Sequence, residues 1–291
     1  MPERVPPRWR CTNTSAMLPP VSATSSHHVV ELIRSFVAHH TPHRKLHHDA
    51  GRGHEIYQVS TMDALLDGVY DGEVTYGELA RHGDFGLGTF NGLDGEMVAV
   101  DGRFYHLRDD GGATPVHPDE RTPFAAVTFF EAETTRVLEG PLARPDLEAA
   151  VDALAPSGNL FYAVRVDGAF ARVVTRTVPM QHAPYPPLTE VTAHEEVTTF
   201  DGVEGTLVGF RTPDYAQGIG IAGYHLHFIT AARDAGGHVL DLELSRGTLA
   251  IGSESELHLC LPRTRAFLEA DLAGRDRDAE IRRAEDALPD S

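Results

Sequence analysis

Alternating apolar and polar positions recur in short segments along the chain, and turn residues separate many of these segments. Asp101-Gly102 is flanked by two such segments, Glu96–Val100 and Arg103–Leu107, which is a strong signal for a two-residue β-hairpin. Two more Asp-Gly pairs lie between alternating segments and predict further hairpins: Leu160–Val166 with Ala169–Thr175, and Glu195–Phe200 with Gly205–Phe210. The chain is therefore expected to be rich in antiparallel strands.

Helical periodicity is confined to a few places. Pro145–Leu154 has an amphipathic pattern with proline at its start, and a second, short helix is expected at Asp278–Leu288. This mixture predicts an α+β fold, mostly β, with antiparallel or mixed sheets in two packed subdomains and few helices. We expect a low-complexity, mobile extension at 1–52, a β-rich subdomain with helices at 53–180, and a second β subdomain at 181–291.

Composition limits the classes of partner. The 291-residue chain has a formal net charge of -18, whereas nucleic acid and anionic membrane surfaces require a basic footprint. We expect neither as a partner. The chain has two cysteines, no run of 18 apolar residues and no apolar leader at its start, which favours a cytoplasmic protein. The one lysine, Lys45, lies in a His-rich tail, so Schiff-base chemistry, which needs a lysine in a formed pocket, is not expected.

Three histidines carry the most specific chemical signal. Side chains alternate between the faces of a strand, so His225 and His227 share one face. If the glycine-rich segment at 233–237 closes a hairpin without a net bulge, His238 pairs with His227. Three imidazoles with a fourth position open are typical of a catalytic Zn²⁺ or a similar divalent ion. With 17 histidines in the chain, ordinary strand histidines are the alternative interpretation.

Other polar residues are less distinctive by themselves. Glu96 follows a glycine-rich bend and Arg176 follows a strand, while Glu280 and Glu285 lie in the predicted terminal helix. A carboxylate or an arginine could assist a metal ion, but spacing alone does not separate these residues from solvated surface charges.

Several motifs, taken together, resemble the α-acetolactate decarboxylase family and occur in that family's order over about residues 54 to 288. They are Gln58–Gly68, Asp84–Phe90 with Leu93–Glu96, Gly205–Phe210, Gly218–Phe228 and Gly236–Asp241. The resemblance implies a zinc-dependent enzyme that converts 2-acetolactate to acetoin and CO₂, on the route to 2,3-butanediol. It also suggests a homodimer.

The resemblance also implies roles for individual residues. His225, His227 and His238 would bind the metal, which would act as an electron sink for the enediolate left by loss of CO₂. Arg176 would hold the substrate carboxylate or the developing oxyanion, and Thr89 is a candidate substrate contact or, equally, a packed strand residue. Glu96 and a glutamate of the C-terminal tail complete the expected catalytic set. We choose Glu285 over Glu280 for the tail because it lies nearer the chain end.

Two other functions compete with this interpretation. A non-enzymatic, cupin-like metal-binding β module also uses two histidines one residue apart. It expects a glutamate a few residues later, however, and the segment after His227 has none. A zinc hydrolase with Glu96 as general base is the second alternative. Neither the metal bound in the cell nor the choice of substrate enantiomer follows from the sequence, since the same imidazoles accept Zn, Co, Ni or Cu.

Overall fold

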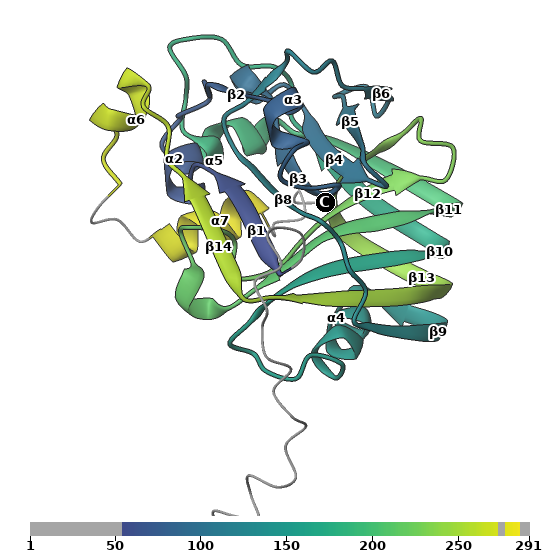
Figure 1. Cartoon of the computed structure of the whole chain (residues 1–291). Coiled ribbons are helices and arrows are strands. Elements are labelled where there is room, and N and C mark those ends of the chain that lie inside the picture. The colour runs from purple at the N-terminus through teal and green to yellow at the C-terminus, as the bar shows by residue number, and fades with distance from the viewer. Residues whose placement is uncertain (1–53, 273–276, 286–291) are drawn as a thin grey trace, which may run out of the picture. The chain divides into compact units, whose positions relative to one another are not determined.

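Strands dominate residues 54–272 and 277–285, the part of the chain that the computed structural model describes (Figure 1). Seven of them form a mixed sheet in the order β14-β1-β8-β3-β4-β5-β6. Their bounds are β1 Glu55–Val59, β3 Phe85–Thr89, β4 Glu96–Val100, β5 Arg103–Leu107, β6 Ala113–Pro115, β8 Ala125–Thr128 and β14 Glu256–Cys260. The edge pair β1 and β14 is parallel, and the other neighbours are antiparallel.

Five longer strands form an antiparallel sheet that closes on itself. They are β9 Thr134–Ala143, β10 Phe161–Thr177, β11 Glu196–Thr212, β12 Gly223–Thr230 and β13 Gly236–Glu254. The pairings β10–β11, β11–β12, β12–β13 and β13–β10 make a closed ring of four strands, and β9 is added to the outer side of β13. Two short strands, β2 Val74–Thr75 and β7 Arg121–Thr122, form a separate pair.

Helices are short and lie around the sheets. They are α2 Met62–Leu66, α3 Tyr76–Leu79, α4 Arg144–Asp152, α5 Leu188–Val191, α6 Arg265–Glu269 and α7 Arg277–Glu285, with 3₁₀ turns η1 Asn91–Leu93, η2 Thr192–His194 and η3 Asp214–Ala216. The amphipathic helix α4 buries Leu147 and Val151 against the five-stranded sheet. The predicted fold class, α+β and mostly β with few helices, is confirmed.

The apolar pattern of β12 explains how the two sheets meet. Leu226 and Phe228 point into the core enclosed by the ring of strands. Ile229, on the opposite face, packs with Leu87 and Val98 of the seven-stranded sheet. Since side chains alternate along a strand, His225 and His227 lie on the same face as Ile229, and this face is turned to the seven-stranded sheet.

Of the three predicted Asp-Gly hairpins, the first is confirmed and the other two are wrong. Asp101 and Gly102 have φ of 54° and 72°, as a two-residue turn requires, and β4 pairs with β5. By contrast, Gly168 lies inside the continuous strand β10, paired with β11 on one side and β13 on the other. Asp201 likewise lies within β11, opposite Arg172. Pairing with strands distant in the sequence therefore outweighs the local turn signal.

The predicted subdomain boundary near residue 180 does not coincide with the division between the sheets. Strand β10 precedes that position but belongs to the five-stranded sheet, and β14 follows it but pairs with β1. Contacts group the described residues into one compact unit. Separate folding of the two parts stays a prediction, and the extension at 1–52 lies outside the described residues. None of the helices in the described ranges has the length and apolar character needed to cross a lipid bilayer.

Glu254 is buried where the chain passes from one sheet to the other, at the end of β13 and just before β14. Its side chain is only 2% exposed, and the hydroxyl of Thr128 donates a hydrogen bond to its Oε1 at 3.1 Å. Burial raises the pKa of Glu254 from 4.5 to about 7. The folded state therefore binds a proton here that the unfolded state has already lost above pH 4.5.

This shift predicts a pH-dependent stability. Because the folded pKa is raised, the contribution of Glu254 is fully present below pH 4.5 and is lost as the pH rises through about 7. Glu254→Gln should be more stable than the parent by about 1–3 kcal/mol at pH 8, and the difference should vanish near pH 4.5. Urea denaturation across this range measures it, with the exposed Glu256→Gln as control. A difference that does not vary with pH would contradict the prediction.

Candidate metal centre and active site

Three imidazoles converge at the hairpin of β12 and β13. His227 pairs directly with His238 across the two strands, so the predicted register is confirmed. His225 lies two residues before His227 on the same face, and the ring centroids of the three histidines are 5.0 to 5.4 Å apart. One ligand atom from each ring lies within 4.8 Å of the others. Such a group can hold one metal ion.

The orientation of His227 suits a metal ligand. Its Nδ1 is 2.8 Å from the carbonyl oxygen of Met97 on β4, and because a carbonyl only accepts, Nδ1 carries the proton. Nε2 of the same ring is then left with a lone pair. This atom is fully buried and has no hydrogen-bond partner among the described residues, although Glu96 Oε2 lies 3.7 Å away. A buried acceptor without a donor fits a site for a cation.

The electrostatic environment keeps two of these imidazoles neutral. Burial lowers the pKa of His227 to about 3, and the positive charge of Arg176 acts in the same direction. For His225, burial is again the main cause, and the pKa lies well below its ordinary value. Metal ions bind the neutral ring, so no proton has to be displaced from either ligand near neutral pH.

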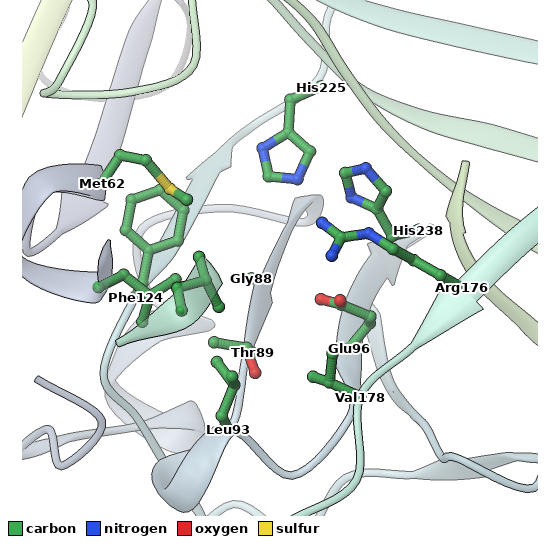
Figure 2. Close-up of a pocket in the computed structure, with 12 residues that line it drawn as sticks. Met62, Gly88, Thr89, Leu93, Glu96, Phe124, Arg176, Val178, His225 and His238 are labelled. Atoms are coloured by element: carbon green, nitrogen blue, oxygen red, sulfur yellow. The ribbon is translucent and has the colours of Figure 1, made fainter. Parts of the chain in front are cut away.

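Arg176 enters the site from β10. Its backbone pairs with His238, and its side chain is buried, with 4% exposure. Figure 2 shows its guanidinium beside His238 and Glu96. Nη1 donates a hydrogen bond to Glu195 Oε2 at 3.2 Å, and Glu195 is itself buried. Burial raises the pKa of Glu195, while the charge of Arg176 opposes the rise.

Glu96 is held by the bend that precedes β4. The hydroxyl of Thr89 donates to the carbonyl oxygen of Gly95 at 2.6 Å, and Thr89 pairs with Glu96 between β3 and β4. His106, stacked on Phe90, has its Nε2 2.5 Å from the carbonyl oxygen of Asp94. Thr89 therefore contacts the bend directly through its hydroxyl and also lines the cavity described next.

A cavity brings these residues together (Figure 2). Polar groups and apolar side chains both contribute to its wall, and its lining consists of Met62, Leu65, Gly88, Thr89, Leu93, Glu96, Phe124, Arg176, Val178, Leu188, His225 and His238. The arrangement offers a metal site, a guanidinium and a carboxylate to a small anionic molecule, with an apolar wall for its carbon substituents. Of the seven site residues expected from the sequence, five line this cavity, namely Thr89, Glu96, Arg176, His225 and His238, and a sixth, His227, lies beside the two lining histidines.

The seventh, Glu285, is the last residue of α7, and its side chain lies outside what the structure describes. The helix packs against α2 and α5, and Ile281 and Ala284 join the buried cluster that contains Met62. Because Met62 also lines the cavity, α7 forms part of the support behind the cavity wall. Glu280 is partly buried on the same helix. The choice between the two glutamates stays a prediction.

Comparison with known proteins gives the family. The sequence profile of α-acetolactate decarboxylase matches residues 56–274. The chain belongs to the α-acetolactate decarboxylase family. The resemblance seen in the sequence motifs is therefore confirmed.

Relatives of similar length support this assignment. The α-acetolactate decarboxylase of Methylococcus capsulatus is 49% identical over 253 residues, which are 87% of this chain and 97% of that protein. The one from Bacillus subtilis strain 168 is 48% identical over 231 residues, covering 79% of this chain and 91% of that protein. A crystal structure of the enzyme from the latter strain matches this fold with a TM-score of 0.79, covering 80% of this chain and 100% of that chain.

Three features of the site in this α-acetolactate decarboxylase family member have no signal in the sequence. Glu195 is one of 43 acidic residues and stands beside another glutamate, so no local signal marks it as buried. His106 occupies an ordinary alternating position in β5. The Met97 carbonyl that orients His227 belongs to the other sheet, and only the three-dimensional structure brings it there.

Removal of one imidazole should weaken metal binding. His238→Ala leaves two rings, and we expect its affinity for zinc to fall more than about 100-fold, since even partners that only orient a ligand are worth 10- to 100-fold. Metal analysis after dialysis, together with competitive titration against a chelator, measures the loss. His117→Ala, at an exposed position far along the chain, serves as the control. Zinc binding at parental strength in His238→Ala would remove His238 from the metal site.

Proposed function

We propose that this chain is a zinc-dependent carboxy-lyase that converts 2-acetolactate to acetoin and CO₂. The observation that carries the proposal is the convergence of three imidazoles, two of which line one cavity together with Arg176 and Glu96. The relatives support the reaction, since they are named α-acetolactate decarboxylases. An arginine and a carboxylate beside the metal ligands favour an enzyme over a module that only stores or senses a metal.

His225, His227 and His238 would hold the ion, with His227 kept in position through its bond to the Met97 carbonyl. When bound, zinc would supply a Lewis acid that stabilises negative charge as it develops on the substrate oxygens. Three neutral ligands leave the positive charge of the ion undiminished. Apart from the histidines, the ionisable side chains that line the cavity are Glu96 and Arg176.

Arg176 would bind the substrate carboxylate. A guanidinium presents several N–H donors in one plane and matches a carboxylate with two hydrogen bonds. Its burial strengthens this attraction, because water competes less for either group. The same contact would fix the bond that breaks, between the carboxylate carbon and C2, relative to the metal ligands.

Glu96 would transfer a proton to the substrate after CO₂ leaves. When CO₂ leaves, its bond electrons remain with the rest of the substrate, and one proton must be added to give acetoin. A carboxyl group held by the bend at Gly95 can transfer that proton to one face of a bound substrate and so determine the configuration of the product. The glutamate of the tail, for which we choose Glu285, is the second proton-transfer group. Thr89 would position Glu96 through the Gly95 carbonyl.

Several further expectations belong to this proposal. We expect a homodimer that acts in the synthesis of acetoin and 2,3-butanediol. The low cysteine content supports a cytoplasmic location, and the negative net charge supports a small molecule, not nucleic acid, as the partner.

One assay tests the reaction. Purified protein incubated with racemic 2-acetolactate should release CO₂ and form acetoin, lose this activity in chelator and regain it with zinc. Arg176→Ala should keep its zinc and lose about 10²–10³-fold in rate, the usual cost of removing a group that binds developing charge. Arg172→Ala, an exposed arginine on the same strand, is the control. Hydrolysis of simple esters without CO₂ release would instead favour the zinc hydrolase.

The tail glutamate can be assigned by a matched pair. Glu285→Gln should lower the rate by about 10²-fold, as expected for loss of a proton-transfer group, and Glu280→Gln should leave the rate near the parental value. Both variants keep the size of the side chain, so α7 should still pack on α2. Steady-state rates with 2-acetolactate decide the matter. A loss seen with Glu280→Gln alone would transfer the role to Glu280, and no loss in either variant would exclude the tail from proton transfer.

A further inference from the structure

Arg176 and Glu195 form a buried charge pair at the edge of the cavity. Their side chains are 4% and 8% exposed, and Nη1 of the arginine is 3.2 Å from Oε2 of the glutamate. A buried guanidinium needs an anionic or hydrogen-bonding partner because burial removes its water shell. Glu195 supplies such a partner without lining the cavity itself.

The two members of the pair come from different elements. Arg176 lies on β10, whereas Glu195 follows η2 and precedes β11. The strands still pair at Thr177 and Glu196, so Glu195 is the first residue beyond the ladder. Its segment is continuous with α5, which contacts α2 and α7. The carboxylate is therefore held next to Arg176 by the start of β11, which pairs with β10, and by the segment that leads from α5.

The negative charge of Glu195 balances positive charge around Arg176. Arg176 lies close to the histidine cluster, since its backbone pairs with His238 and its side chain lines the same cavity as His225 and His238. A divalent ion added to that cluster increases the repulsion on the guanidinium. The carboxylate of Glu195, 3.2 Å from Nη1, is an anion that opposes this repulsion and helps to hold the guanidinium at the cavity wall.

We propose that Glu195 is a positioning residue that orients Arg176 toward the carboxylate of the bound substrate. Glu195 holds Nη1, and the guanidinium contributes to the lining of the cavity beside His238 and Glu96 (Figure 2). This role rests on the proposed function, because the orientation of Arg176 affects the reaction only if Arg176 binds the substrate. Glu195 itself does not touch the reacting atoms.

The first test uses adjacent residues. Glu195→Gln keeps the size and an acceptor oxygen but removes the charge, and Glu196→Gln is the matched control at the exposed neighbouring position. With 2-acetolactate as substrate, kcat/KM should fall about 10- to 100-fold in Glu195→Gln, the range for loss of a group that orients a functional residue. Glu195→Asp keeps the charge on a shorter side chain and should recover part of the loss.

Zinc content separates a loss of Arg176 positioning from damage to the metal site. Zinc content should equal that of the parent in both Glu195 variants, since neither touches a metal ligand. Loss of zinc from Glu195→Gln, or an equal loss of activity in Glu195→Gln and Glu196→Gln, would overturn the proposal. Parental kcat and KM in Glu195→Gln would overturn it as well.

A double-mutant cycle tests whether Glu195 acts through Arg176. In an Arg176→Ala background, Glu195→Gln should cause no further loss of kcat/KM, because the group that it orients is absent. The same background should gain thermal stability from Glu195→Gln, since a buried carboxylate has lost its partner there. Equal losses in the two backgrounds would contradict the proposal. If the parent itself formed no acetoin, the proposed function would fail, which is a different result from an active parent with an unaffected Glu195→Gln.

Discussion

The antiparallel register between β12 and β13 is the constraint on which the site depends. Side chains of directly opposed residues stand on the same face of a sheet, and this rule places His238 beside His227, with His225 two residues away on the same side. A shift of one residue in either strand would send an imidazole into the apolar core occupied by Phe228. That core, filled by the alternate positions of β12, therefore protects the convergence of the three rings.

The second requirement is that two sheets meet over these rings. The five-stranded sheet provides the histidines and Arg176, while the seven-stranded sheet provides Glu96 and the carbonyl of Met97. Ile229, two residues beyond His227, packs in the apolar contact between the sheets. Burial in this contact keeps His225 and His227 neutral and removes competing water from Arg176, so the packing that stabilises the fold also sets the electrostatic character of the cavity.

Features that depend on local pattern could be predicted from the sequence. The shared face of His225 and His227 follows from strand alternation, and the pairing with His238 follows from a hairpin without a bulge. The turn at Asp101-Gly102 and the helix with Leu147 and Val151 are equally local. The two wrong hairpins fail for the opposite reason, since Gly168 and Asp201 are fixed by strand partners 29 to 79 positions away along the chain. Glu195 could not be recognised because only the pairing of β10 with β11 brings it to its partner Arg176.

The central claim is that His225, His227 and His238 bind one zinc ion together. X-ray absorption spectroscopy at the zinc edge of the metal-loaded protein tests it most directly. The account predicts three imidazole nitrogens at about 2.0–2.1 Å, with the remaining position occupied by oxygen. A spectrum with fewer than three imidazoles, or with sulfur in the coordination sphere, would contradict it.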